Sequence, residues 1–178
     1  MTVLLDIFAA MLPYLLCSAP IIAVFRIHMR KKRSSEVLRE ILVWTFLLYC
    51  VGIASQTLLP TDIPGDVNFM PFRIVRLLKY GGTYAFVRYF LCNIFMLMPI
   101  SMFSCLLYNG AHAYRGVLVG LFSSVFIEIV QLFVGRSLDI DDIILNTVGA
   151  VLGVGIYMLF VKLTPEFVNR CRVRRKEG

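Results

Sequence analysis

Charged side chains are scarce in this chain of 178 residues. Asp, Glu, Lys and Arg together make up 16% of it, while apolar residues, counting aromatics and cysteine, make up 59%. Soluble domains contain about 25% charged residues, so the composition excludes an ordinary soluble globular protein. The mean hydropathy of +0.80 instead puts the chain in the membrane class.

Histidine and cysteine motifs are also missing. The two histidines, His28 and His112, lie away from the acidic residues near position 140, and the sequence has no HExxH, no Ser-x-x-Lys and no glycine-rich phosphate loop. The five cysteines include no CxxC pair, which argues against a zinc site or a disulfide framework. We therefore expect no metal and no cofactor.

The net charge of +7 raises the question of a polyanionic partner. Lys and Arg, however, lie beside apolar runs that are long enough to cross a bilayer, and this arrangement favours anionic lipid headgroups over nucleic acid. We therefore expect contact with membrane lipid and none with nucleic acid.

Long apolar runs are what the chain does have. A helix needs about 20 mostly apolar residues to cross the hydrocarbon core, and five segments meet this requirement: about 3–25, 38–59, 89–109, 116–134 and 143–161. The first lacks the basic residues that begin a cleaved signal peptide, so we expect a retained anchor. The sequence thus predicts an all-α, polytopic helical membrane bundle, with 1–178 forming a single membrane domain.

The distribution of Lys and Arg predicts the orientation of the bundle, because basic residues favour cytoplasmic loops. Of the 18, 13 lie between the first two spans, between the third and fourth, or after the fifth. The N-terminus is therefore expected outside, and residues 162–178 are expected to form a basic cytoplasmic tail. This orientation directs the short loop at 136–142 outward.

A basic amphipathic segment precedes the third span. Pro71 suits the first turn of a helix and Gly81 a helix end. Between them Arg73, Arg76 and Lys79 recur every three residues among apolar neighbours. This pattern is typical of a short helix in the outer membrane interface, with its three cations on lipid headgroups. The alternative is a solvated basic loop packed on the bundle, and the sequence does not decide between them.

Two pairs of glycines have the spacing that lets membrane helices approach closely. Gly116 and Gly120 form a GxxxG in the fourth span, and Gly149 and Gly153 form another in the fifth. We expect both pairs to serve packing within one chain rather than dimerisation.

Polar residues gather at the junction of the fourth and fifth spans, where burial in a membrane is costly unless the groups are paired or used. Glu128 and Gln131 share one face of the fourth span at a spacing of three. On the fifth, spacings of three and seven put further polar residues on one face, with Asp139 suited to cap the helix. The expected pocket consists of the polar residues that reach the outer leaflet: Asn68, Asn93, Glu128, Gln131, Arg136, Asp139, Asp142 and Asn146.

Three interpretations of this polar cluster remain open. In the first it is structural: Glu128 pairs with Arg136 or is neutral, the amides bond to neighbouring helices, and the acidic loop caps the fifth span. In the second, the cluster and the basic outer helix bind a phosphate- or peptide-bearing lipid headgroup. In the third, which the missing motifs disfavour, Glu128, Asp139 and Asp142 bind a divalent ion or act as acid and base.

These residues resemble the VanZ-like family of bacterial membrane proteins. The matching pieces are NFMPF at 68–72, Asn93 followed by Met98 and Pro99, and IEIVQLFVGRSLDIDDIILNTVGAVLG at 127–153. The VanZ-like region covers about 42–161. The segment MLMPIS after Asn93 departs from the family's pattern because it lacks a glycine.

The resemblance implies a multi-span bacterial membrane protein linked to low-level resistance to the glycopeptide teicoplanin, and it carries no catalytic mechanism. We therefore expect a protein that is not an enzyme. It would bind a cell-envelope precursor, a lipid or a glycopeptide-related ligand in an outward pocket and contribute to glycopeptide resistance. The alternative is a small membrane enzyme acting on lipid-linked phosphate or peptide substrates. A transporter subunit is a third hypothesis, which the absence of internal repeats disfavours.

Overall fold

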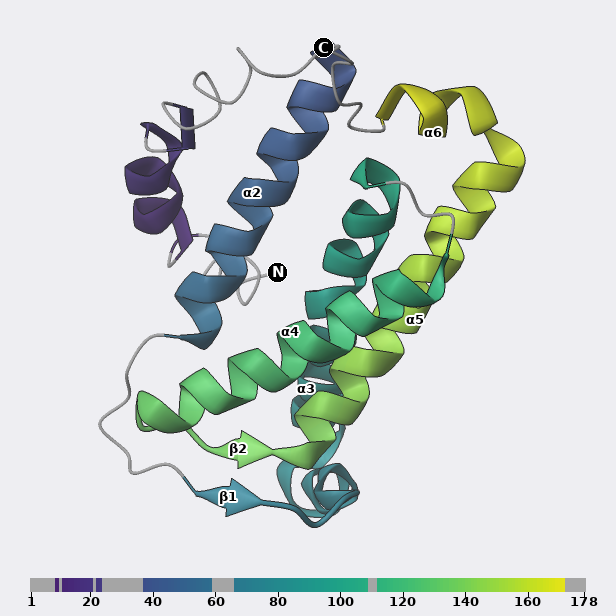
Figure 1. Cartoon of the computed structure of the whole chain (residues 1–178). Helices are drawn as coiled ribbons and strands as arrows, with labels where there is room; N and C mark the ends of the chain where they lie inside the picture. Colours follow the sequence, from purple (N-terminus) through teal and green to yellow (C-terminus); the bar gives the residue numbers. More distant parts are fainter. Residues whose placement is uncertain are drawn as a thin grey trace.

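The computed structural model describes residues 9, 11–20, 22–23, 37–58, 66–108 and 112–171. Most of these residues are helical, and two very short strands pair at one end of the helices (Figure 1). The elements, in chain order, are α2 (Val37–Thr57), β1 (Val67–Asn68), α3 (Arg73–Leu107), α4 (Tyr114–Phe133), β2 (Leu138–Asp139), α5 (Ile140–Leu163) and α6 (Pro165–Cys171).

Four of the described helices are long and apolar enough to cross a membrane: Val37–Thr57, Tyr89–Leu107, Tyr114–Phe133 and Ile140–Leu163. Each lies within a few residues of a span predicted from the sequence, so the all-α membrane bundle is confirmed. Only residues 9, 11–20 and 22–23 of the predicted first span are among the described residues. The described part of it contains a shorter apolar helix, Met11–Pro20.

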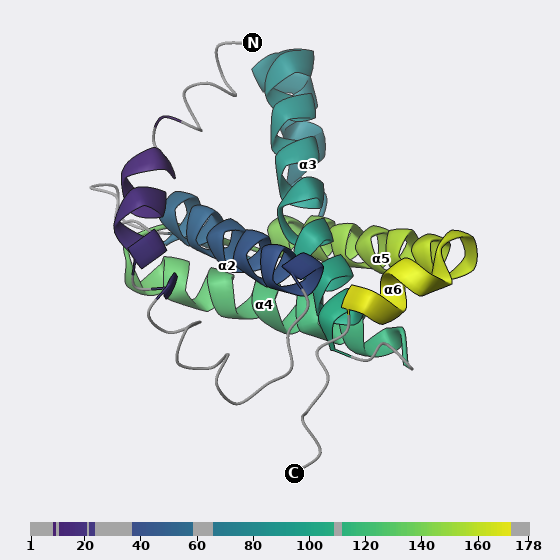
Figure 2. The ribbon, with the colours of Figure 1, turned by 90° about the horizontal axis from the view of Figure 1, so that it is seen from above.

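α5 is the helix on which the bundle is packed, because both α3 and α4 lie against it (Figure 2). A Cβ at Gly149 would overlap the Ile94 carbonyl oxygen of α3, and one at Gly153 would overlap the carbonyl oxygen one turn further on. In α4, a Cβ at Gly120 would overlap that of Ala150. The two GxxxG pairs therefore pack helices of one chain together, as predicted.

α2 joins the bundle at the proline of α3. Pro99 has no N–H, so the carbonyl group four residues before it lacks its usual helical partner. The Tyr49 hydroxyl of α2 lies 3.1 Å from that carbonyl oxygen, of Phe95, and donates at 2.8 Å to the next one, of Met96. A neighbouring helix thus satisfies backbone that would otherwise be unpaired within the membrane.

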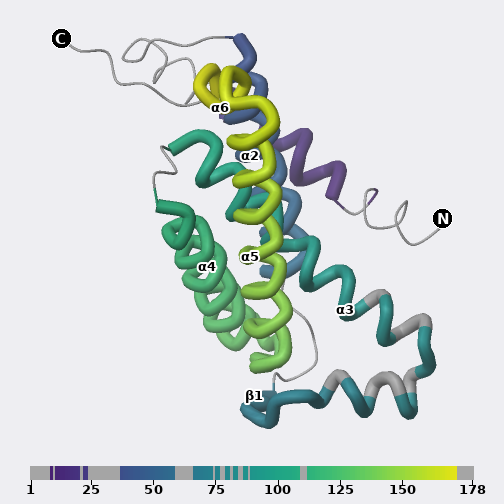
Figure 3. The backbone as a smooth tube through the Cα atoms, turned by 90° about the vertical axis from the view of Figure 1, so that its right-hand side faces the viewer, coloured from purple at the N-terminus to yellow at the C-terminus, as the bar shows by residue number. Residues whose placement is uncertain are grey.

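α3 breaks at Gly82, whose backbone angles, φ 77° and ψ 162°, lie in a region that is essentially restricted to glycine. Figure 3 shows α3 turning sharply between its start, near β1, and its membrane span. The predicted short helix ahead of the third span is therefore confirmed. Arg73, Arg76 and Lys79 are exposed on it, and their contact with lipid headgroups stays a prediction.

The segment expected to be a basic tail begins within helical structure. Lys162 is in the last turn of α5, and the short helix α6 then turns across the end of the bundle (Figure 1). In α6, Val168 is 2% exposed and Cys171 is fully buried, and both pack in one apolar cluster with Cys105 of α3. The remainder of the predicted tail, residues 172–178, lies outside the described residues.

Candidate functional site

A parallel two-strand ladder joins the two loops that carry much of the predicted site. β1 pairs with β2, with Val67 opposite Leu138 and Asn68 opposite Asp139. The Leu138 N–H also donates to the Asp66 carbonyl oxygen at 2.9 Å. The ladder lies at the end of the bundle where α4 ends and α5 begins (Figure 1). It holds the loop that precedes α3 against the loop that precedes α5.

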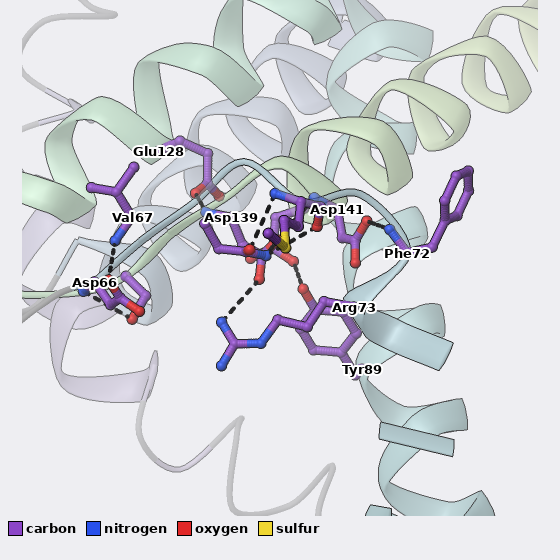
Figure 4. Close-up of polar contacts among 12 residues, drawn as sticks. Asp66, Val67, Phe72, Arg73, Tyr89, Glu128, Asp139 and Asp141 are labelled. Atoms are coloured by element: carbon purple, nitrogen blue, oxygen red, sulfur yellow. Dashed lines mark hydrogen bonds and ion pairs between the residues drawn. The ribbon is translucent and has the colours of Figure 1, made fainter. Parts of the chain in front are cut away.

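Asp139 connects this ladder to both adjoining helices (Figure 4). Its Oδ1 accepts from the Asp141 N–H at 3.0 Å, which makes it the N-cap of α5, as predicted. The same oxygen accepts from Asn68 Nδ2 at 2.9 Å, and Oδ2 lies 4.0 Å from the Arg73 guanidinium. The Asp139 N–H donates to Glu128 Oε2 at 2.9 Å. One residue thus links β1, α3, α4 and α5.

Asp142 lies in the first turn of α5 and faces the beginning of the α3 span. Its Oδ1 accepts from Asn93 Nδ2 at 2.8 Å and from the Tyr89 hydroxyl. Tyr89 and Asn93 are four residues apart and therefore lie on the same face of α3. The carboxylate of Asp142 is consequently held by two donors from one neighbouring helix, in a half-buried position.

Asp141 holds the strained end of the loop that precedes α3. Phe72 has φ 66° and ψ 22°, a left-handed conformation that is unusual for a bulky residue. Its N–H donates to Asp141 Oδ1 at 2.6 Å, as Figure 4 shows. The acceptor side of this bond is buried, with Asp141 3% exposed, and the bond fixes the start of α3 on the start of α5.

A second layer of polar side chains lies deeper in the bundle. Asn146 is one turn below Asp142, is fully buried, and donates from Nδ2 to Ser124 Oγ of α4 at 3.1 Å. Among the described residues, three buried side-chain atoms have no hydrogen-bond partner: Ser101 Oγ, Gln131 Oε1 and Asn146 Oδ1. Polar groups that are buried without a partner are costly and uncommon, so these acceptors mark positions that a ligand group or water can use.

Arg136 lies apart from the acidic network, on the side of α2. Its N–H donates to the Gln131 carbonyl oxygen at 2.8 Å, and its guanidinium donates to the Gln56 carbonyl oxygen at 3.3 Å. The first bond ties it to the end of α4 and the second to the end of α2. The predicted pairing of Arg136 with Glu128 is absent from the salt bridges of the described residues, and Glu128 accepts instead from the Asp139 N–H.

The network as a whole is acidic, and its carboxylate oxygens already accept hydrogen bonds from the chain. Its carboxylates, of Glu128, Asp139, Asp141 and Asp142, accept from amide, hydroxyl and backbone donors of the chain, and Arg73 is the cation that comes nearest to them. Within the described residues, no three His, Cys, Asp or Glu side chains are grouped so that they could hold a metal ion. A ligand that binds at this site would therefore contact mainly carboxylate oxygens, which accept hydrogen bonds.

The eight residues predicted for the pocket form three groups. Asn68, Asn93, Glu128, Asp139 and Asp142 belong to the acidic network. Asn146 lies one turn deeper, and Gln131 with Arg136 lies toward α2. The sequence prediction omitted Tyr89 and Asp141. Tyr89 could have been predicted, because its spacing of four from Asn93 puts both on one helix face. Asp141 could not, because it contacts a loop whose position helical periodicity does not predict.

Comparison with known proteins places the chain in a family. A family model described as VanZ/LLP1 matches residues 46–161, more than half of the chain, including the acidic network from Asn68 to Asp142 and the deeper Asn146. No curated protein matches the chain, and no solved structure matches it. Because the match covers more than half of the chain, including α4, the membrane span of α3, most of α2 and α5, and every residue of the predicted pocket, the chain belongs to the VanZ/LLP1 family.

Proposed function

We propose that this protein is a bacterial cell-membrane protein that binds a cell-envelope lipid or a glycopeptide-related ligand at the outward end of its bundle. Binding there lowers the susceptibility of the cell to glycopeptides such as teicoplanin, without a chemical reaction. In this proposal the N-terminus is outside and the C-terminus is cytoplasmic, so the β1–β2 ladder faces the cell envelope.

The observation that carries the proposal is the convergence of polar groups from β1, α3, α4 and α5 on Asp139 and Asp142. Ionisable and amide groups at the end of membrane helices are costly to bury. Fewer ionisable and amide groups than this would be enough to link the two loops structurally. The unpartnered Gln131 Oε1 adds a buried acceptor that the chain itself leaves unused, one turn along α4 from Glu128.

The chemistry of the surroundings defines the ligand class. The carboxylates favour hydroxyl, amide N–H or ammonium donors, whereas the exposed cations Arg73, Arg76 and Lys79 favour phosphate. A headgroup that carries both phosphate and hydrogen-bond donors would satisfy the two regions together. Cell-envelope precursors bearing a peptide or sugar on a lipid phosphate have this combination.

The test is a variant that removes the charges while keeping the shapes: Glu128→Gln, Asp139→Asn and Asp142→Asn together. Expressed in a glycopeptide-susceptible bacterium, the unaltered protein should raise the teicoplanin concentration that inhibits growth, and the triple variant should not. Glu166→Gln, on the exposed surface of α6, is the matched control and should behave as the unaltered protein. Membrane levels are measured for all three, and a triple variant that is present at the normal level and still protects would refute the proposal.

A second candidate function is a small membrane enzyme that acts on lipid-linked phosphate or peptide substrates. It is favoured by one observation, the contact of the Tyr89 hydroxyl with the Asp142 carboxylate, which sets a proton donor beside an acceptor at the edge of an acidic site. This function predicts that the purified protein releases phosphate from a lipid-linked substrate in the presence of a divalent ion. Phosphate release should be lost in the Asp142→Asn variant. If the folded, unaltered protein releases no phosphate in this assay, the enzyme hypothesis is wrong.

A further inference from the structure

An apolar groove runs between α2 and α4, beside the acidic network. Its volume is about 410 Å³, within the range of about 300–1,000 Å³ that is usual for ligand sites. The walls include Cys50, Ala54 and Thr57 of α2 and Phe122 and Ile127 of α4, with Ile100 of α3 at the floor. Nearly all of these groups are hydrocarbon or sulfur, so the groove suits a hydrocarbon chain.

The length of the groove fits one leaflet of a bilayer. On α2 its lining runs from Cys50 to Leu58, a rise of roughly 12 Å along the helix axis. Half of the hydrocarbon core of a membrane is about 15 Å thick. The side chain of Phe126 in α4 borders the groove and is 62% exposed, which is expected of a wall that meets lipid.

A cation lies at the end of the groove that is nearer the loops. The Arg136 guanidinium donates to the Gln56 carbonyl oxygen, next to the groove residue Thr57. Within the described part of the chain, no carboxylate lies within salt-bridge distance of Arg136, although its charge acts on the Glu128 carboxyl from further away. A guanidinium has five N–H donors, and the contact with Gln56 uses one. The remaining donors are available to an anionic group at this end.

We infer that the groove between α2 and α4 holds an acyl chain of a phosphate-bearing membrane lipid, with the lipid phosphate on Arg136. The apolar walls, the depth of one leaflet and the unpaired cation at the headgroup level together match such a lipid and no soluble molecule. The inference rests on the proposed function and extends it. The bound envelope molecule would be a lipid whose acyl chain enters the groove laterally from the bilayer.

Photolabelling tests the inference directly. The full chain is reconstituted in phosphatidylcholine vesicles that contain a phosphatidylglycerol tracer with a diazirine in its acyl chain. After irradiation, mass spectrometry locates the labelled residues. Label should be severalfold higher on 50–58 and 122–127 than on the lipid-facing surface of α5 at 151–159. Even labelling of all lipid-facing helices would overturn the inference.

Two variants with a matched control complete the experiment. Ala54→Trp fills the groove and should remove the label from it, while Val151→Trp, on an exposed position of α5, should leave it unchanged. Arg136→Gln removes the charge-assisted bond and should lower labelling by the anionic tracer about tenfold, and Arg136→Lys should restore part of it. Groove labelling that is indifferent to Ala54→Trp or to Arg136→Gln counts against the lipid site.

The inference builds on the proposed function, but the experiment separates the failure of one from the failure of the other. The triple variant of Glu128, Asp139 and Asp142 should label the groove as the unaltered protein does, even when it no longer protects cells from teicoplanin. Loss of protection with intact labelling separates the two sites. Conversely, protection that persists in Ala54→Trp with an unlabelled groove shows that the acidic network acts without the lipid.

Discussion

At the scale of single residues, the most constrained position is Phe72. A non-glycine residue in the left-handed region costs about 1–3 kcal/mol and persists only where its surroundings hold it. Here the bond from the Phe72 N–H to Asp141 does so, at 2.6 Å. Its aromatic ring is 69% exposed, so packing of the ring does not account for the choice of residue.

Replacement of Phe72 by glycine should therefore cost less stability than the same change at a neighbour. Phe69 is 71% exposed and lacks the positive φ. Both changes increase the entropy of the unfolded chain equally, so their difference isolates the backbone strain. Phe72→Gly should be more stable than Phe69→Gly by about 1 kcal/mol, as measured by thermal unfolding in detergent. Equal unfolding temperatures would show that Phe72 is not strained.

Asp139 is the residue whose loss should release the loop that precedes α3. Asp139→Ala removes the N-cap of α5 and leaves Asn68 Nδ2 without its acceptor, so unfolding should be easier by about 1–3 kcal/mol. Amide hydrogen exchange in residues 66–72 should rise as well. Asp66→Ala is the control, because the Asp66 carboxylate is exposed and accepts from its neighbour Val67. Unchanged exchange in Asp139→Ala would contradict its role as the link.

At the scale of elements, the approach of α5 to α3 depends on the absence of two side chains. The carbonyl groups that face Gly149 and Gly153 belong to the backbone of α3 and cannot rotate away. The helices must therefore separate if a methyl group is added at either position. This closeness is what brings Asp142 within reach of Asn93.

The glycines of α5 provide a matched pair for testing this packing. Gly149→Ala should destabilise the protein by about 1–3 kcal/mol, because the added methyl group overpacks the interface. Gly155→Ala has open space around it and should be neutral or slightly stabilising, since alanine favours a helix over glycine. Chemical unfolding of the two variants in the same detergent measures the difference. A gain of similar size in both would indicate that helix propensity, not packing, governs these positions.

Some elements could be predicted from the sequence because their signals are local. Four spans follow from continuous apolar runs, and the cap at Asp139 follows from residue type and position. The β1–β2 ladder could not be predicted, because two paired residues show no periodicity and Asn68 and Asp139 are far apart in the chain. α6 could not be predicted for a similar reason. It is one short helix beside basic residues, and the burial of Val168 and Cys171 depends on contacts with α3 and α5.

At the scale of the whole molecule, the remaining prediction is orientation. The basic residues cluster before α2 and after α5, which favours a cytoplasmic position for these two segments. The alternation of the spans then puts the loop between α3 and α4 on the cytoplasmic side and the segment before the α3 span on the outer side. In a cysteine-free background, Arg76→Cys should react with a membrane-impermeant maleimide in intact cells. Arg115→Cys, at the opposite end, should react only after the cells are permeabilised. The reverse pattern would turn the acidic network toward the cytoplasm and remove the basis for an envelope ligand.

The central place of α5 also has a consequence for biosynthesis. α5 is the last long helix in the chain, yet α3 and α4 both pack against it. During translation the earlier helices enter the bilayer before their main partner has left the ribosome. The acidic loop ahead of α5 cannot meet β1 until that moment. Assembly of the acidic network is therefore a late event, and a ribosome that stalls before Ile140 leaves α3 and α4 inserted without their main partner.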